Sequence, residues 1–201
     1  MIGIDTHIAH WFHEHLTLSL IAVFLAMSDP GSKEWVTGIT VTSAVYLAWK
    51  RHWYALLALG LAVPGGMLLN QEMKDWIHRP RPFQASPYIE MGGYSFPSGH
   101  TMAATLIYGL LAGFSLHLFK ELRWRVLSIG TAATLVLAVG FSRVALGAHY
   151  LTDVLGAMAT GAAWLRICSL TVQAVRRAFQ RSRVEIAVTA QEARLTDSEP
   201  S

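Results

Sequence analysis

The chain has 201 residues, of which 53% are hydrophobic and only 14% are charged. A soluble domain carries about 25% charged residues, so this chain has too little charge to cover a water-facing surface, and its hydrophobicity excludes intrinsic disorder. The single cysteine, Cys168, excludes an internal disulfide framework and a cysteine metal cluster. The net charge of +3 comes without a basic run interleaved with aromatic residues, so nucleic acid is not an expected partner.

In chain order, a mixed segment comes first and six apolar stretches without charge follow it. Residues 8–16 combine histidines with Trp11 and Phe12, which predicts a short helix lying on the membrane surface. The six stretches are rich in Ala, Leu and Gly and do not alternate with period two, which favours helices over strands. Several of them reach the roughly 20 residues of a membrane crossing only with flanking polar residues. They are residues 16–28, 35–49, 53–69, 101–119, 126–142 and 154–165.

These patterns predict an all-α polytopic membrane protein with six transmembrane helices and a short N-terminal interfacial helix. Residues 1–183 form a single membrane-embedded domain, and residues 184–201, which end in TDSEPS, form a polar, disordered tail. Basic clusters near residues 50–51, 120–125 and 176–183 fall on one side of a six-helix arrangement. By the positive-inside rule, that side and both termini are expected to be cytoplasmic.

Three polar clusters interrupt the apolar chain, and all are expected on the opposite, periplasmic or extracellular side. They are residues 74–82 (KDWIHRPRP), 94–101 (YSFPSGHT) and 142–153 (SRVALGAHYLTD). Ionisable groups at membrane depth are costly, so each cluster is a functional hypothesis. The permanent cations Lys74, Arg81 and Arg143 face a single carboxylate, Asp153, which predicts an anion site. These cations would repel a divalent metal, although His100, His149 and Asp153 could be interpreted as metal ligands; no metal and no cofactor are expected.

Phosphate is the anion that these residue types fit. Arginine forks match tetrahedral oxyanions, and lysine supplies a point charge. The turn Pro97-Ser98-Gly99 leads into an apolar stretch, so free amides at a helix N-terminus would face the ligand. Gly99 allows close backbone approach, and Ser98 is expected either to cap the helix or to donate to the ligand.

Two histidines in these clusters suggest two catalytic roles. His149 and Asp153 are spaced i,i+4, which predicts one helix face, with the carboxylate fixing the imidazole tautomer. His100 lies beside the anion-binding turn, where it could give a proton to a leaving oxygen. Spacing alone leaves the assignment open, and the carboxylate partner favours His149 as the attacking group.

The motifs K-x6-RP, PSGH and SR-x5-H-x3-D resemble the three-part signature of the type 2 phosphatidic acid phosphatase superfamily. The resemblance implies a metal-independent membrane phosphatase in which His149 forms a phosphohistidine, Asp153 orients it and His100 protonates the leaving group. The phosphate-binding residues that it implies are Lys74, Arg81, Ser98, Gly99 and Arg143.

We therefore expect a multi-pass hydrolase of the cell inner membrane, among membrane lipids, that acts on a lipid phosphate or diphosphate. Undecaprenyl diphosphate is the favoured substrate, and phosphatidylglycerophosphate or phosphatidic acid are the alternatives. A transporter that binds a phosphate-bearing lipid without hydrolysis and a vanadate-dependent halide oxidase are the rival classes. The sequence carries no signal for an oligomeric state.

Other polar residues receive plainer interpretations. His78 and Arg79 are expected to be interfacial or structural. His7, His10, His13 and His15 could form a metal site, but a solvated amphipathic face is favoured.

Overall fold

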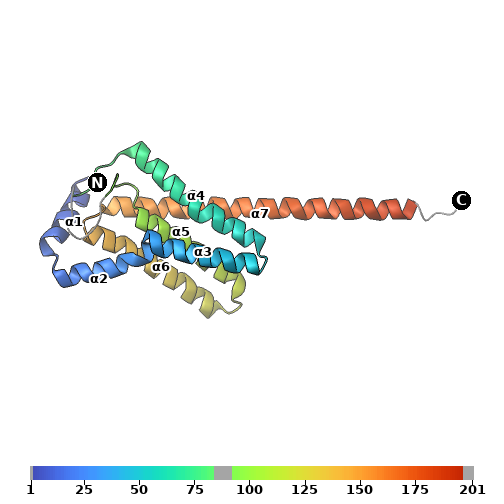
Figure 1. The fold of residues 1–201 in the computed structure, drawn as a ribbon, viewed down its shortest axis with the longest axis horizontal. Helices are drawn as coiled ribbons and strands as arrows, with labels where there is room; N and C mark the ends of the chain where they lie inside the picture. Colours follow the sequence, from blue (N-terminus) through green and yellow to red (C-terminus); the bar gives the residue numbers. More distant parts are fainter. Residues whose placement is uncertain (1, 84–91, 197–201) are drawn as a thin grey trace.

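The computed structural model describes residues 2–83 and 92–196, apart from the side chains of residues 2, 183–184 and 187–196. Within these residues every regular element is helical, which confirms the all-α prediction. The elements, drawn in Figure 1, are α1 (Ile2–His15), α2 (Leu18–Ser28), the short 3-10 helix η1 (Asp29–Gly31), α3 (Lys33–Trp49), α4 (Trp53–Ile77), α5 (Gly99–Leu118), α6 (Leu122–Ala145) and α7 (Leu151–Thr196).

Helix α5 is the centre of the bundle, and α3, α4, α6 and α7 pack around it. Its first turns carry Met102, Leu106 and Ile107, all completely buried. The outer helices instead expose large apolar side chains, such as Leu137 of α6 at 61%. Among the described residues, four helices are long and apolar enough to cross a membrane: α4, α5, α6 and the part of α7 up to Ser182. The apolar outer faces are those that hydrocarbon requires.

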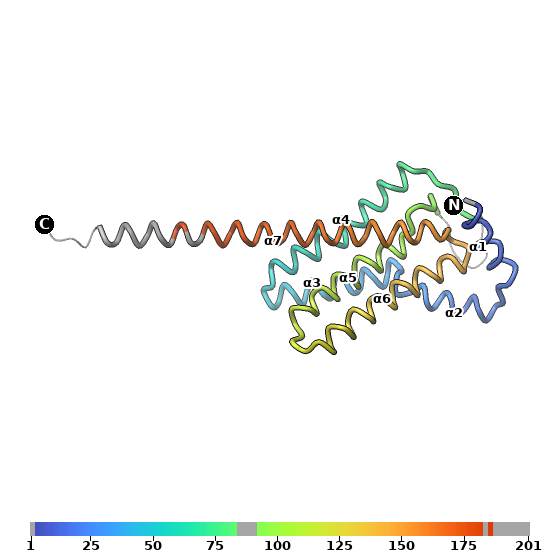
Figure 2. The backbone as a smooth tube through the Cα atoms, turned by 180° about the vertical axis from the view of Figure 1, so that it is seen from behind, coloured from blue at the N-terminus to red at the C-terminus, as the bar shows by residue number. Residues whose placement is uncertain are grey.

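The first two predicted crossings are one interrupted traverse. Helix α2 has 11 residues, a rise of about 16 Å, whereas the hydrocarbon core is about 30 Å thick. Figures 1 and 2 show α2 and α3 following one another along the length of the bundle. The chain breaks at Asp29–Gly31, where Gly31 lies so close to α5 that an added Cβ would stand 2.8 Å from the carbonyl oxygen of His100. The expectation of six crossings is therefore not confirmed, since α2 and α3 together make one traverse and α4, α5, α6 and α7 make four more.

The N-terminus lies at the opposite end of the bundle from the last described turn of α7 (Figures 1 and 2). Helix α1 covers the start of α7, where Asp5 accepts hydrogen bonds from the backbone N–H and the hydroxyl of Thr152. The expectation that both termini share the cytoplasmic side is therefore not confirmed, because it counted α2 and α3 as separate crossings. Helix α1 is the short N-terminal helix that the sequence predicts; Trp11 is exposed on it, and Asp5 and Ala9 are buried.

The predicted tail begins within α7. The helix continues through residue 184, where the sequence predicts disorder, as far as Thr196. Residues 197–201 lie outside the described residues.

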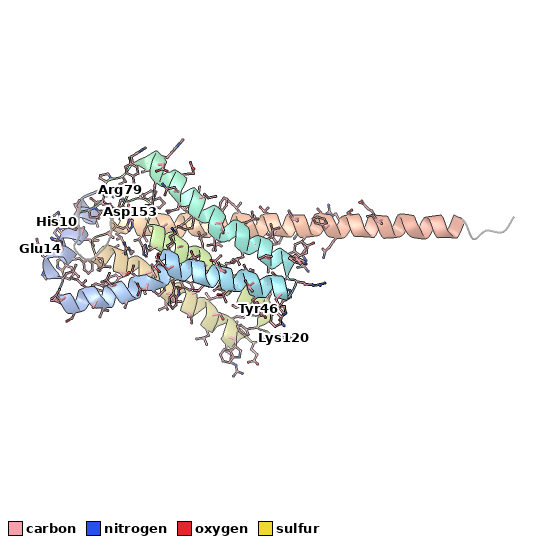
Figure 3. The ribbon with its side chains drawn as sticks, viewed as in Figure 1. His10, Glu14, Tyr46, Arg79, Lys120 and Asp153 are labelled. Carbon is pink, nitrogen blue, oxygen red and sulfur yellow. The ribbon has the colours of Figure 1, made fainter. Side chains whose placement is uncertain are left out.

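The arrangement predicts that Glu14 in α1 and Lys120 between α5 and α6 lie on opposite sides of the membrane (Figure 3). With Cys168 replaced by serine, Glu14→Cys and Lys120→Cys should react with a membrane-impermeant maleimide from opposite faces of sealed vesicles. Detergent lysis should make both variants fully reactive. Labelling of both from the same face would contradict the five-traverse arrangement.

Candidate active site

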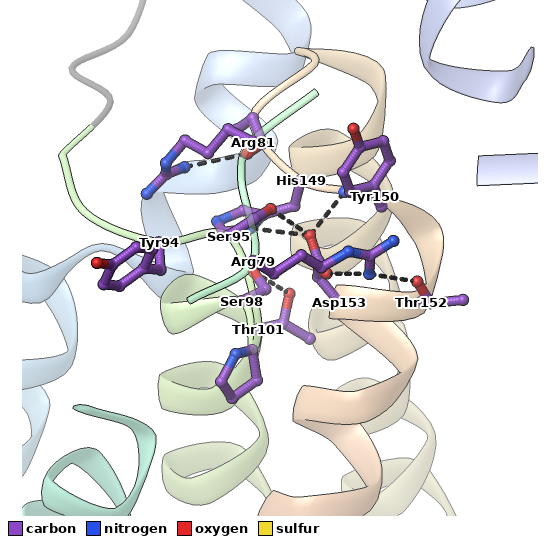
Figure 4. A network of polar contacts seen from close by, with 12 residues as sticks. Arg79, Arg81, Tyr94, Ser95, Ser98, Thr101, His149, Tyr150, Thr152 and Asp153 are labelled. Atoms are coloured by element: carbon purple, nitrogen blue, oxygen red, sulfur yellow. Dashed lines mark hydrogen bonds and ion pairs between the residues drawn. The ribbon is translucent and has the colours of Figure 1, made fainter. Parts of the chain in front are cut away.

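Hydrogen bonds join the three polar clusters pairwise at one end of the bundle (Figure 4). The first and second clusters meet where the Lys74 ammonium donates to the carbonyl of Tyr94 at 2.8 Å. The first and third meet where Arg81 donates to the carbonyl of Ala148 at 3.0 Å. The second and third meet where the backbone N–H of Ser98 donates to the carbonyl of Asp153 at 3.2 Å. Segments far apart in the chain therefore form one polar centre.

The carboxylate of Asp153 is the hub of this centre and is completely buried. Its Oδ2 accepts from the backbone N–H of Tyr150 at 2.9 Å and from the hydroxyl of Ser95. Its Oδ1 accepts from Nη1 of Arg79 at 2.5 Å. Asp153 is the third residue of α7, so its bond to Tyr150 has the geometry of a capping box and satisfies a backbone donor at the helix start. These partners hold the carboxylate in one orientation.

His149 lies in the turn between α6 and α7, two residues before α7 begins, and not on a helix face with Asp153 as expected. The chain enters this turn through Gly147, whose φ of +68° is costly for any residue with a Cβ. The turn nevertheless brings Nδ1 of His149 to 3.6 Å from Oδ2 of Asp153 and to 3.4 Å from the hydroxyl of Ser95. Nε2 is thereby left as the ring nitrogen available for chemistry.

The three predicted phosphate-binding cations lie in this centre, and none of them has a carboxylate partner within ion-pair distance among the described residues. Arg81 donates to the carbonyls of Gly92 and Gly93 as well as to Ala148. Arg143 is buried, and its Nη1 donates to the hydroxyl of Ser28 at 3.0 Å. Its Nε is a buried donor with no hydrogen-bond partner in the described part of the chain. Such an orphaned donor is satisfied by an anion's oxygen.

The turn before α5 also has the features of an anion site. Ser98 is the N-cap residue of α5, but its side chain makes no capping hydrogen bond and accepts from Thr101 at 3.0 Å. Of the two roles expected for Ser98, the structure therefore disfavours capping. Gly99 and His100 form the first turn of α5, and His100 lies close enough to Arg143, His149 and Arg81 to interact electrostatically with them. All eight predicted site residues are thus brought together.

The surroundings of His149 keep its imidazole neutral. Burial lowers its pKa to about 4, and the positive charges of Arg81 and Arg143 act in the same direction against the opposing effect of Asp153. Burial also lowers the pKa of Arg81 from its ordinary value, although Asp153 acts in the opposite direction. A neutral imidazole is the form that can attack phosphorus.

Sequence reasoning missed three residues that contact the predicted ones, and a fourth, Asp5, that contacts one of these three. Ser95 bonds to Asp153, and Ser28 bonds to Arg143. Arg79, which was expected to be interfacial or structural, bridges Asp153 and Asp5. The duplicated RPRP was a signal for Arg79, and a carboxylate within a largely apolar N-terminal segment was a signal for Asp5. Nothing in the sequence singles out the two serines.

The chain is similar to known proteins over more than half of its length. A family model described as PAP2 superfamily matches residues 51–177. A phosphatidylglycerophosphatase B from Bacillus subtilis (strain 168) is 36% identical over 124 residues, which are 61% of this chain and 60% of the length of that relative.

Two solved structures share the fold. A transmembrane PAP2 type phosphatidylglycerolphosphate phosphatase from Bacillus subtilis superimposes with a TM-score of 0.74 and 28% identity over 86% of each chain. Aquifex aeolicus LpxE gives a TM-score of 0.64 and 19% identity over 82% of this chain and 94% of its own.

The environment of His149 predicts an acidic titration. In detergent-solubilised protein with 15N-labelled histidine, the imidazole signal that disappears in His149→Asn should titrate with a midpoint of about 4, not at the ordinary value of about 6.5. Above this midpoint the ring is neutral, so the attacking form dominates at neutral pH. Arg81→Gln should raise the midpoint, because it removes a positive charge that disfavours the imidazolium. A wild-type midpoint near 6.5 would contradict the buried position of the ring.

Proposed function

Because this chain belongs to the PAP2 superfamily, we propose that it is an integral membrane phosphatase that hydrolyses the phosphate ester of a lipid through a phosphohistidine on His149. The observation that carries the proposal is the convergence of Lys74, Arg81 and Arg143, without carboxylate partners of their own, around the His149–Asp153 pair. Three cations beside a neutral imidazole suit the transfer of a phosphoryl group.

The first half of the reaction forms a covalent intermediate. Nε2 of His149 attacks phosphorus while the bond from phosphorus to the lipid oxygen breaks, and His100 gives that oxygen a proton. Asp153 faces Nδ1 and stabilises the positive charge that develops on the ring. The phosphate oxygens are held by the side chains of Lys74, Arg81 and Arg143, by Ser98 and by the backbone amide of Gly99.

The second half releases inorganic phosphate. His100, now neutral, takes a proton from a water molecule whose oxygen attacks phosphorus as the bond to Nε2 breaks. The same cations stabilise both transition states, because the charge on the transferring group is similar in each. No step in this scheme draws on a metal ion.

An apolar pocket beside the site supports a lipid substrate. It lies between α1, α6 and α7, has a volume of about 510 Å³ and is lined by apolar side chains and His7. Its walls include Val144 and Val154, the chain neighbours of Arg143 and Asp153. A hydrocarbon tail in this pocket would leave the headgroup at the cations.

We propose phosphatidylglycerophosphate as the substrate, in place of the undecaprenyl diphosphate that the sequence favoured. The support is the pair of Bacillus subtilis relatives, both of which are phosphatases of this lipid by name. A phosphate monoester also presents a single tetrahedral group to the cations. Undecaprenyl diphosphate and phosphatidic acid become comparison substrates.

We further propose that the protein is a multi-pass protein of the cell inner membrane with its site on the non-cytoplasmic side. Lys50, Arg51 and Lys120 lie at the end of the bundle opposite the site, and Figure 3 shows Lys120 far from Arg79 and Asp153. The positive-inside rule assigns that basic end to the cytoplasm. Helix α1 would then lie on the outer surface as an interfacial helix.

Purified protein in detergent should release phosphate from phosphatidylglycerophosphate in the presence of a chelator, faster than from phosphatidic acid or undecaprenyl diphosphate. His149→Ala should lower kcat by about 10³-fold or more, because it removes the nucleophile. Circular dichroism should show unchanged helix content. Glu14→Gln, on exposed α1 surface, is the matched control and should keep full activity.

Activity that disappears with chelator and returns with a divalent ion would overturn the metal-independent scheme. Flux of the lipid phosphate across liposomes without hydrolysis would favour the transporter, and halide oxidation with vanadate would favour the oxidase. Full activity of His149→Ala would remove the phosphohistidine.

The pocket predicts a chain-length effect. Leu155 is 53% exposed and lines the pocket, so Leu155→Trp should fill part of it and exclude about two methylene groups of the tail. At about 0.8 kcal/mol per methylene, KM for a long-chain substrate should rise about tenfold. KM for a dibutyryl analogue should not change. Leu170→Trp, also on α7 and 48% exposed but outside the pocket, is the matched control. Equal effects of both variants would place the tail elsewhere.

A further inference from the structure

Asp5 is a buried carboxylate on an otherwise amphipathic surface helix, and its contacts lead into the site. It is 3% exposed, although its neighbours Ile4 and Thr6 face outward or lie at the edge. Its Oδ2 accepts from Nη2 of Arg79 at 2.8 Å and from the hydroxyl of Thr152 at 2.5 Å. Its Oδ1 accepts from the backbone N–H of Thr152 at 3.2 Å. A carboxylate that is buried in this way is retained only with such partners.

Arg79 carries the connection from Asp5 to the catalytic pair. One guanidinium nitrogen, Nη2, binds Asp5, and the other, Nη1, binds both Oδ1 of Asp153 and the hydroxyl of Thr152. The guanidinium also lies 4.3 Å from the ring centroid of Tyr150. Figure 4 shows Arg79 between Asp153 and Thr152 at the start of α7. Hydrogen bonds to Asp5 on one side and to Asp153 on the other therefore hold the planar guanidinium of Arg79 in one position.

Asp5 also fixes the backbone that bears Asp153. Thr152 is the second residue of α7, and its N–H has no partner within the helix. Asp5 supplies that partner from α1, while Asp153 itself supplies the partner of the Tyr150 N–H. The first turn of α7 is thus held by one carboxylate from α1 and one of its own, and the helix dipole favours both.

The charges give this arrangement a consequence for the reaction. Asp5, Arg79 and Asp153 form a cluster with net charge −1, so Arg79 orients Asp153 without cancelling its charge. Without Asp5, Arg79 and Asp153 would neutralise each other. The carboxylate would then support less of the positive charge that develops on His149.

We propose that Asp5 is a positioning residue of the active site, acting through Arg79 and Thr152 to hold Asp153 aligned with His149 and to keep Arg79 from cancelling its charge. The proposal rests on the proposed phosphatase function. It assigns a role to a helix that carries none of the three motifs. Asp5 is not a catalytic residue, because it contacts neither His149 nor the phosphate-binding cations.

The test compares two isosteric changes on the same helix, Asp5→Asn and Glu14→Gln. Asp5→Asn should lower kcat on phosphatidylglycerophosphate about tenfold or more, as expected for the loss of a charged hydrogen-bonding partner, and should leave KM nearly unchanged. Glu14 is exposed, and Glu14→Gln should leave both constants unchanged. Asp5→Glu should recover part of kcat, because it restores the charge.

A double-mutant cycle tests the route through Arg79. In an Arg79→Gln background, Asp5→Asn should lower kcat by less than it does in the wild type, since the bridge is already absent and only the contact with Thr152 is left to lose. Arg79→Lys covers the case in which Asp5→Asn does not fold. A lysine keeps the charge but has no fork to span two carboxylates, so kcat should fall as in Asp5→Asn.

A readout that needs no activity separates this proposal from the proposed function. The 15N signal of the His149 imidazole should move in Asp5→Asn and stay in place in Glu14→Gln. Inactivity of the wild type on every lipid phosphate would overturn the phosphatase function alone. An unmoved His149 signal, or wild-type kcat in both Asp5→Asn and Arg79→Lys, would overturn the positioning role alone.

Discussion

The burial of one carboxylate, that of Asp153, is the constraint on which the rest of the site depends. A fully buried ionised group is stable only if hydrogen-bond donors and an opposite charge surround it. Here the donors come from the loop before α5 (Ser95), from the segment after α4 (Arg79) and from the start of α7 (Tyr150). Satisfying Asp153 therefore requires the three polar clusters to converge. The same contacts that make burial tolerable place His149 beside the carboxylate, so folding of this end of the bundle and assembly of the site are one event.

The remaining cations explain why the centre is suited to an anion. Arg79 forms ion pairs with two carboxylates. By contrast, Lys74 and Arg81 donate to backbone carbonyls, and Arg143 donates to a hydroxyl. Neutral oxygens satisfy hydrogen bonds but do not cancel charge. In an apolar bundle, this uncompensated charge is costly until a dianionic group enters. The contacts around Asp153 offset this electrostatic cost in the free protein. The cations are therefore already in position when the substrate binds, and no reorganisation is needed during phosphoryl transfer.

Sequence reasoning predicted the chemistry of this protein better than its topology. Lys74, Arg81 and Arg143 stand out in an apolar chain because charge there has few purposes, and three cations of these types indicate an anion site. The number of traverses could not be predicted from residue types. The sequences of α2 and α3 are apolar like those of separate crossings, and only the direction in which the chain continues at Asp29–Gly31 distinguishes the two cases. The i,i+4 spacing led to the assignment of His149 to a helix face. The same spacing is also compatible with a turn followed by a helix, which is what the structure shows. Ser28 and Ser95 were missed, since serines occur throughout such chains and only three-dimensional contact distinguishes these two.

The two parts of the chain contribute differently to the site. The region that matches the family model, residues 51–177, contains all three motifs. The segment before it contains none, yet it contacts a residue of each polar cluster: Asp5 binds Arg79 and Thr152, Gly31 packs against the backbone of His100, and Ser28 binds Arg143. The break between α2 and α3 is what allows the last two contacts, because it brings a backbone without a Cβ against the first turn of α5 and a small hydroxyl side chain against the last turn of α6. In the proposed site the motifs contain the reacting groups, and the N-terminal segment provides contacts that hold these motifs in place. Helix α1 is therefore a part of the active site's framework, although its composition alone resembles that of a simple membrane-surface helix.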